Sequence, residues 1–94
     1  MTADIRIGII GDFNPAYPSH PATNEAIRHA ADRLAVSARV DWLPTPALLA
    51  PDADATLAEY DGLWASPGSP YQSMEGGLAG IRFARERDRP FLGT

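Results

Sequence analysis

Four short apolar segments along the chain predict β-strands. Residues 5–10 are rich in β-branched side chains and almost continuously apolar, which is typical of a buried strand. Residues 38–43 alternate polar and apolar side chains before a proline and predict a shorter second strand. Residues 62–66 and 90–93 are brief apolar runs that predict a third and a fourth strand. Segments of a different pattern separate the four strands.

The first two strands are separated by a loop and a helix. The stretch from Asp12 to Thr23 contains three prolines and no helical period, so we expect a loop there. Thr23 is predicted to cap a helix whose apolar residues recur at helical spacing as far as Ala35. The helix therefore connects the first strand to the second.

A second helix is predicted between the third and fourth strands. Ser73 is a suitable N-cap, and the helical pattern runs to about Arg87. A short helical turn is also predicted around Thr56–Tyr60, in an otherwise proline-broken loop. The predicted inner face of the second helix consists of Met74, Leu78, Ile81 and Ala84.

Strands that alternate with helices indicate a parallel sheet built from right-handed crossovers. We predict one α/β domain over residues 1–94, a three-layer flavodoxin-like fold with strand order 2-1-3-4 and the first two helices on opposite faces. Two clear helices barely cover four strands, and the last strand leaves an open edge. The sequence therefore predicts a partial domain that forms a homo-oligomer through its exposed sheet edge.

Composition narrows the classes of function. The 94 residues carry a net charge of −4, which disfavours a nucleic-acid partner. No apolar run has the roughly 20 residues of a membrane span, and the N-terminus lacks a secretory signal pattern, so we expect a cytoplasmic protein without a membrane partner. The absence of cysteine excludes a disulfide scaffold and a cysteine-ligated metal. We expect neither a metal nor a cofactor.

Candidate chemistry gathers where the predicted strands end, because ligands of open parallel sheets bind outside the carboxyl ends of the strands. The segments at this edge are Gly11–Pro15 with His20, Ser66–Tyr71 and Gly93–Thr94. The turn at Pro67-Gly68 is the most informative, since glycine lets a backbone N–H approach a developing oxyanion. Taken alone, a Pro-Gly pair is an ordinary turn signal.

Several short motifs follow one another along the chain in a recognisable order. The first are Ile7–Gly11, Glu25–Ala30, Asp61–Trp64 and the Pro67-Gly68 turn. The runs that follow are more specific: Met74–Gly76, Ile81–Glu86 and Pro90–Thr94. In this order the motifs make the chain resemble the class I glutamine amidotransferase domain of CTP synthase. The resemblance covers nearly the whole chain but only the first half of the family's domain.

The resemblance implies half of an active site. In the family the fourth strand ends in Gly-x-Cys-x-Gly, and Gly93-Thr94 match its first two positions as the lip of this nucleophile elbow. The nucleophile is expected immediately after Thr94, and the partner histidine and glutamate further along. None of the catalytic residues then lies within the 94 residues. The oxyanion and glutamine pocket falls on Pro67, Gly68, Ser69 and Pro70.

The resemblance further implies that a full-length form hydrolyses glutamine to supply ammonia, with a synthetase as a candidate partner, and that the 94-residue chain alone is inactive.

The chain departs from the family pattern at the turn. Ser69 stands where the family usually has a second glycine, and Pro70-Tyr71 replace Phe-Gly. Because the synthetase domain is missing, a stand-alone homologue is favoured over CTP synthase itself. Three explanations are open for why the sequence stops just before the expected nucleophile. They are a chain cut after Thr94, a modified residue at position 95, and a recoded codon, such as one for selenocysteine.

The loop after the first strand also partly matches the motif of a different enzyme class. Nucleotidyltransferases of the HxGH type carry Gly-x-Phe-x-Pro-x-His-x-Gly-His, and four residues match at this spacing: Gly11, Phe13, Pro15 and His20. Tyr17 and Ser19 replace the first histidine and the glycine. Because the two histidines of this motif bind the nucleotide phosphates, the loss of one weakens phosphate binding. A degenerate nucleotidyltransferase is therefore one alternative, and a non-catalytic binding or assembly module is another.

Three polar residues of the same loop form a second tier of candidate site residues: Asp12, Asn14 and His20. Asp12 and His20 are the types of residue that form an acid/base pair. The simpler interpretation is a histidine solvated in a surface loop.

Overall fold

The computed structural model describes residues 3–67 and 71–93, and it confirms the predicted fold class. Four parallel strands form one sheet in the order β2-β1-β3-β4. None of the helices in the described part of the chain has the length and hydrophobicity needed to cross a bilayer. In chain order the elements are β1 (Ala3–Ile10), α1 (Ser19–Leu34), β2 (Val36–Leu43), the 3-10 helix η1 (Thr45–Leu49), α2 (Ala53–Leu57), β3 (Gly62–Ala65), α3 (Met74–Glu86) and β4 (Phe91–Gly93).

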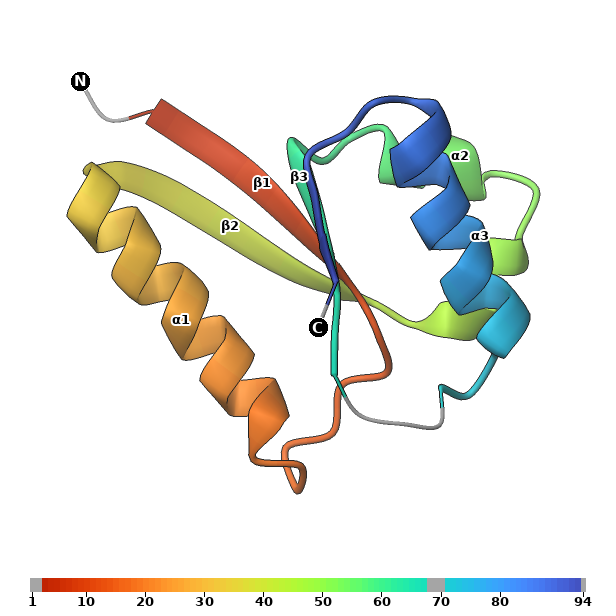
Figure 1. Ribbon diagram of the computed structural model, residues 1–94, viewed down its shortest axis with the longest axis horizontal. Coiled ribbons are helices and arrows are strands. Elements are labelled where there is room, and N and C mark those ends of the chain that lie inside the picture. Colours follow the sequence, from red (N-terminus) through yellow and green to blue (C-terminus); the bar gives the residue numbers. More distant parts are fainter. Residues whose placement is uncertain (1–2, 68–70, 94) are drawn as a thin grey trace.

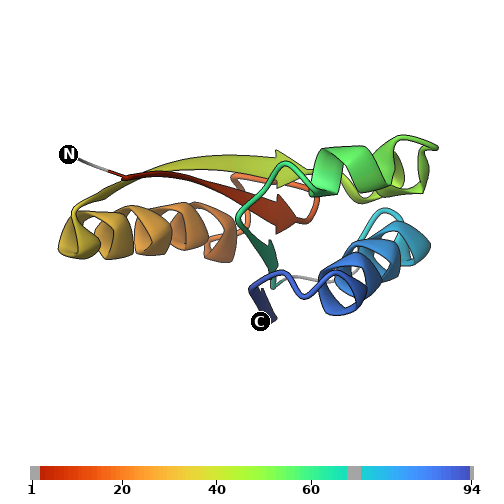
Figure 2. The same cartoon turned by 90° about the horizontal axis from the view of Figure 1, so that it is seen from above.

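The sheet separates two layers of helices, as right-handed crossovers predict. Figure 1 shows α1 on one side of the strands and α2 and α3 on the other. The view from above in Figure 2 places α1 at one end of the molecule and α2 and α3 at the opposite end. A core cluster lies between the sheet and the second helix layer and consists of Ile10, Leu43, Leu48, Leu57, Tyr60, Leu63, Phe83 and Ala84.

Helix α1 begins earlier than the sequence predicts. It starts at Ser19, inside the segment expected to be a loop, and Pro21 lies in its first turn. Proline is tolerated there because the first N–H groups of a helix have no intrahelical partner. Thr23 is therefore not the cap: its side chain is buried, and its hydroxyl donates to the Ser19 carbonyl at 2.7 Å.

Helix α3 begins as predicted but packs through a different face. Ser73 is its N-cap, and the Ser73 hydroxyl accepts a hydrogen bond from the Gly76 N–H at 3.0 Å. Met74 and Leu78, expected inside, are 54% and 51% exposed. Ala84 is buried as predicted, but the other buried residues of the helix are three glycines and one aromatic residue: Gly76, Gly77, Gly80 and Phe83.

The glycines bring α3 into backbone contact with η1. A Cβ added to Gly76 would lie only 1.8 Å from the Thr45 carbonyl oxygen. A Cβ on Gly80 would lie 2.8 Å from the Ile10 side chain. A bulkier residue at either position would therefore force the helix away from its neighbours.

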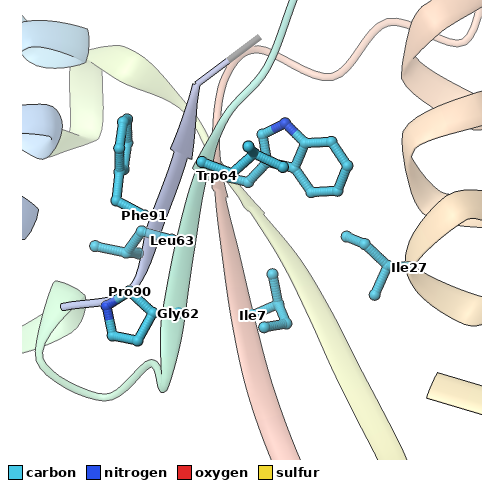
Figure 3. A pocket seen from close by; sticks show the side chains of 8 residues that line it. Ile7, Ile27, Gly62, Leu63, Trp64, Pro90 and Phe91 are labelled. Atoms are coloured by element: carbon cyan, nitrogen blue, oxygen red, sulfur yellow. The ribbon is translucent and has the colours of Figure 1, made fainter. Parts of the chain in front are cut away.

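Strand β4 forms the far edge of the described sheet and is thinly covered. Its three residues are all exposed, including the large side chains Phe91 and Leu92. A hollow of about 330 Å³ lies next to it and is lined in part by Ile27 of α1. Figure 3 shows Trp64 directed toward α1 across this hollow, with Leu63 on the other side of the strand. Apolar surface thus remains uncovered around β3 and β4.

Candidate functional site

The ends of β3 and β4 meet at one edge of the sheet. Ala65 pairs with Gly93 in parallel register, so the connection that begins at Ser66 and Pro67 emerges beside the end of β4. Figure 1 shows the carboxyl ends of β1 and β3 at the same edge. Of the positions predicted to form the oxyanion turn and the lip of the elbow, Pro67 and Gly93 are placed. Gly68, Ser69, Pro70 and Thr94 lie outside the described residues.

His20 is not a solvated loop residue, in contrast to the simpler interpretation of the sequence. It lies in the first turn of α1 and is only 3% exposed. Its Nδ1 atom accepts a hydrogen bond from the Asn14 N–H at 2.9 Å. Its Nε2 atom lies 3.2 Å from the Pro67 carbonyl oxygen. The sequence missed this environment because it predicted a loop where the helix has already begun.

Aromatic rings surround the His20 imidazole. The ring centroids of Trp42 and Tyr17 lie 4.7 Å and 5.3 Å from that of His20, and the centroid of Phe13 lies at 6.0 Å. Trp42 is itself oriented by a hydrogen bond of 2.7 Å from its Nε1–H to the Asn24 Oδ1 atom. The edge of the sheet beside the first turn of α1 is therefore an aromatic cluster around one buried histidine.

Asp12 connects three segments at the same edge. Its carboxylate accepts hydrogen bonds from the Thr45 N–H at 2.9 Å and from the Thr45 hydroxyl at 2.8 Å. It also accepts one from the Gln72 N–H at 2.9 Å. The Thr45 hydroxyl in turn accepts from the Ser73 N–H at 2.9 Å. Asp12 thus links the end of β1 to the start of η1 and to the entrance of α3.

Asn14 lies between Asp12 and His20 along the chain, and these two residues bind different partners among the described residues. Asn14 stabilises the loop between them, since its Oδ1 atom accepts from the Ala16 N–H at 2.9 Å while its own N–H donates to His20. A side chain that bonds to the backbone two residues on is a common way to shape a tight turn. Asn14 therefore shapes the entrance to α1.

Thr45 was not singled out from the sequence, and no role was assigned there to the side chains of Ser66 and Tyr71, which lie in a segment predicted at this edge. Thr45 is completely buried between Asp12 and Ser73, and no periodic pattern marks it. Ser66 is buried, and its hydroxyl has no hydrogen-bond partner within the described part of the chain. Tyr71 donates its hydroxyl proton to the Ser66 carbonyl at 2.9 Å, and burial raises the pKa of Tyr71. The phenol therefore remains a donor at neutral pH.

A hollow of about 390 Å³ opens beside Asp12. It is bordered by the ends of β1 and β2 and by the residue before the α3 cap: Gly11, Asp12, Phe13, Trp42, Pro44 and Gln72. Across residues 3–67 and 71–93, no three His, Asp or Glu side chains come together as a metal site would require.

We expect the Asp12 contacts to contribute measurably to stability. Asp12→Ala would leave donors of Thr45 and Gln72 without their acceptor, and it should lower the free energy of unfolding by about 1–2 kcal/mol. Asp52→Ala is the matched control, because Asp52 is exposed and its side chain caps no helix N–H. Urea unfolding of both variants checks this, and equal losses would contradict the proposed contribution.

Comparisons with known proteins agree with this architecture. No family model matches the chain. The CTP synthase of Acidobacterium capsulatum is 33% identical over 92 residues, which are 98% of this chain and 17% of the relative. The CTP synthases of Methanopyrus kandleri and Sulfolobus acidocaldarius are 33% and 32% identical and each covers 96% of this chain. The chain thus spans about one sixth of the length of these relatives.

A solved structure shows the same fold. The glutaminase domain of Trypanosoma brucei CTP synthase with bound acivicin superposes with a TM-score of 0.81 at 22% identity. The superposition covers 95% of this chain and 35% of the solved chain. Its fold agrees with the parallel sheet and strand order described above. Sequence and fold together therefore relate this chain to the class I glutamine amidotransferase domain of CTP synthase, as its motifs predicted.

Proposed function

We propose that the chain forms the N-terminal half of a glutamine amidotransferase domain, whose complete form hydrolyses glutamine and supplies ammonia. The observation that carries the proposal is the similarity to CTP synthases along 98% of the chain. The pairing of Ala65 with Gly93 supports it, because this register brings the two segments assigned to the site to neighbouring positions. Residues 1–94 then form a single partial domain.

The proposed reaction needs a nucleophile that attacks the side-chain amide carbon of glutamine. In a form that continues past Thr94, the nucleophile follows Thr94 directly, at the carboxyl end of β4. Pro67, Gly68, Ser69 and Pro70 line the glutamine pocket, and a backbone N–H near Ser69 stabilises the oxyanion. Ammonia leaves, and water releases glutamate from the covalent intermediate. A synthetase is a candidate acceptor of the ammonia.

Ammonia release from glutamine tests the proposal. We expect no turnover by the 94-residue chain, because an oxyanion turn without a nucleophile cannot form the covalent intermediate. A form that extends past Thr94 should release ammonia, and substitution of its first added residue by alanine should abolish the release. Turnover by the 94-residue chain would contradict the assigned nucleophile. Inactivity of the extended form would favour the nucleotidyltransferase or the non-catalytic module, which assays with nucleotides and binding partners then separate.

We further propose that the chain self-associates through β4. The exposed Phe91 and Leu92 lie on the edge strand of the described sheet, where main-chain groups can pair with another strand. Light scattering over a range of concentrations should show an oligomer that Leu92→Arg weakens. Leu34→Arg, at an exposed position on α1, is the control and should leave the oligomer intact. A monomer at high concentration would contradict the proposal.

A further inference from the structure

The imidazole of His20 joins three segments that are distant from one another along the chain. His20 belongs to the first turn of α1, Asn14 to the loop before it, and Pro67 to the connection after β3. Figure 1 shows the first turn of α1 and the end of β3 at the same edge of the sheet. Because His20 is 3% exposed, bulk water has little access to replace either partner. The ring is thus a fixed link between two connections at the candidate site.

The two partners select one protonation state of the ring. A backbone N–H can only donate, so Nδ1 of His20 must accept from Asn14 and carry no proton. A carbonyl oxygen can only accept, so Nε2 must carry the proton that it donates to Pro67. Only the neutral imidazole with its proton on Nε2 satisfies both contacts.

The ring also has little freedom to turn. Trp42 packs against it at 4.7 Å between centroids, and Tyr17 meets it nearly edge-on at 5.3 Å. A ring held by packing on its faces and by hydrogen bonds at both nitrogens loses little further entropy when it restrains another group. The aromatic cluster therefore keeps Nε2 directed at the connection after β3.

Pro67 depends on this contact more than another residue would. Proline has no backbone N–H, so its carbonyl is its only main-chain hydrogen-bonding group. Among the described residues, His20 Nε2 is in hydrogen-bond contact with the Pro67 carbonyl oxygen. The next residues, 68–70, are those that the proposed function assigns to the glutamine pocket.

We infer that His20 is a positioning residue: its Nε2–H fixes the Pro67 carbonyl and so holds the start of the proposed oxyanion turn against α1. The inference rests on the proposed function for its consequence in catalysis. The tautomer of His20 and the restraint on Pro67 are properties of the described residues themselves and can be measured without glutamine.

Two substitutions separate the two hydrogen bonds of His20. In His20→Gln the amide reaches the position of Nε2 and can donate to Pro67. In His20→Asn the amide lies at the position of Nδ1, so it can meet Asn14 but not Pro67. His29→Gln is the matched control, because His29 is a largely exposed histidine on the same helix.

Nitrogen-15 NMR and amide hydrogen exchange of the full chain provide the readouts. We expect the unsubstituted His20 ring to show the Nε2–H tautomer. Exchange at Tyr71 and Gln72, which follow the turn, should accelerate by about 2- to 10-fold in His20→Asn, the equivalent of one lost hydrogen bond. It should stay near the unsubstituted rate in His20→Gln and in His29→Gln.

The inference is overturned by an Nδ1–H signature of His20, or by equal exchange in the Asn and Gln variants. The ring signature is read on the unsubstituted protein, so it decides the matter even if His20→Asn does not fold. If the exchange pattern appears but an extended form releases no ammonia, the proposed function fails and the positioning role stands. If an extended form releases ammonia but the Asn and Gln variants exchange equally, the proposed function stands and the positioning role of His20 fails.

Discussion

Ser69→Pro should lower the rate of glutamine hydrolysis by about 10²–10³-fold in a form that extends past Thr94, while Ser69→Ala should change it little. The reason is that the proposed oxyanion donor is a backbone N–H. Alanine retains this group, whereas proline removes it. Loss of one oxyanion donor from a preorganised site typically costs this much in rate.

Steady-state rates of ammonia release by both variants test this expectation. Circular dichroism and thermal unfolding show whether the Ser69→Pro variant is folded. The side-chain volume changes little in Ser69→Ala, so that variant serves as the control for substitution at this position. If Ser69→Ala were as damaging as Ser69→Pro, the hydroxyl would be the working group and the backbone oxyanion assignment would be wrong.

Gly76→Ala should destabilise the protein by about 1–3 kcal/mol, although the same change in an ordinary helix stabilises it by up to about 1 kcal/mol. Gly76 lies in the first turn of α3, where an added Cβ would meet the backbone oxygen of Thr45 at 1.8 Å. A backbone atom cannot rotate away as the end of a side chain can. The helix would have to move from η1, and the contacts of Thr45 with Asp12 and Ser73 would loosen with it.

Chemical unfolding of Gly76→Ala beside Leu78→Ala provides the comparison. Leu78 lies on the same helix but is half exposed, so its truncation should cost far less than that of a core leucine. An increase in the free energy of unfolding for Gly76→Ala would show that α3 and η1 are not in contact as described.

Local sequence patterns predicted the elements that depend on local physics. The β-branched run before Gly11 and the brief apolar runs near residues 62–66 and 90–93 predicted strands that the structure confirms within about two residues of their bounds. The order 2-1-3-4 followed from the handedness of short crossovers rather than from any one residue. Ser73 was predicted as a cap because its hydrogen bond reaches only three residues along the chain.

The sequence by itself therefore determined the layers and the strand order, and it also carried the motifs of the amidotransferase resemblance. Only the tertiary structure decided how the side chains at the carboxyl ends of the strands are used. His20 is buried because α1 begins at Ser19 and meets the connection after β3, which lies 47 residues further along the chain. Asp12 meets Thr45 and Gln72 across similar separations. The inner face of α3 consists largely of glycine because close backbone approach to η1 outweighed the burial of Met74 and Leu78. Such contacts join residues that no local period relates, so packing in three dimensions selects them.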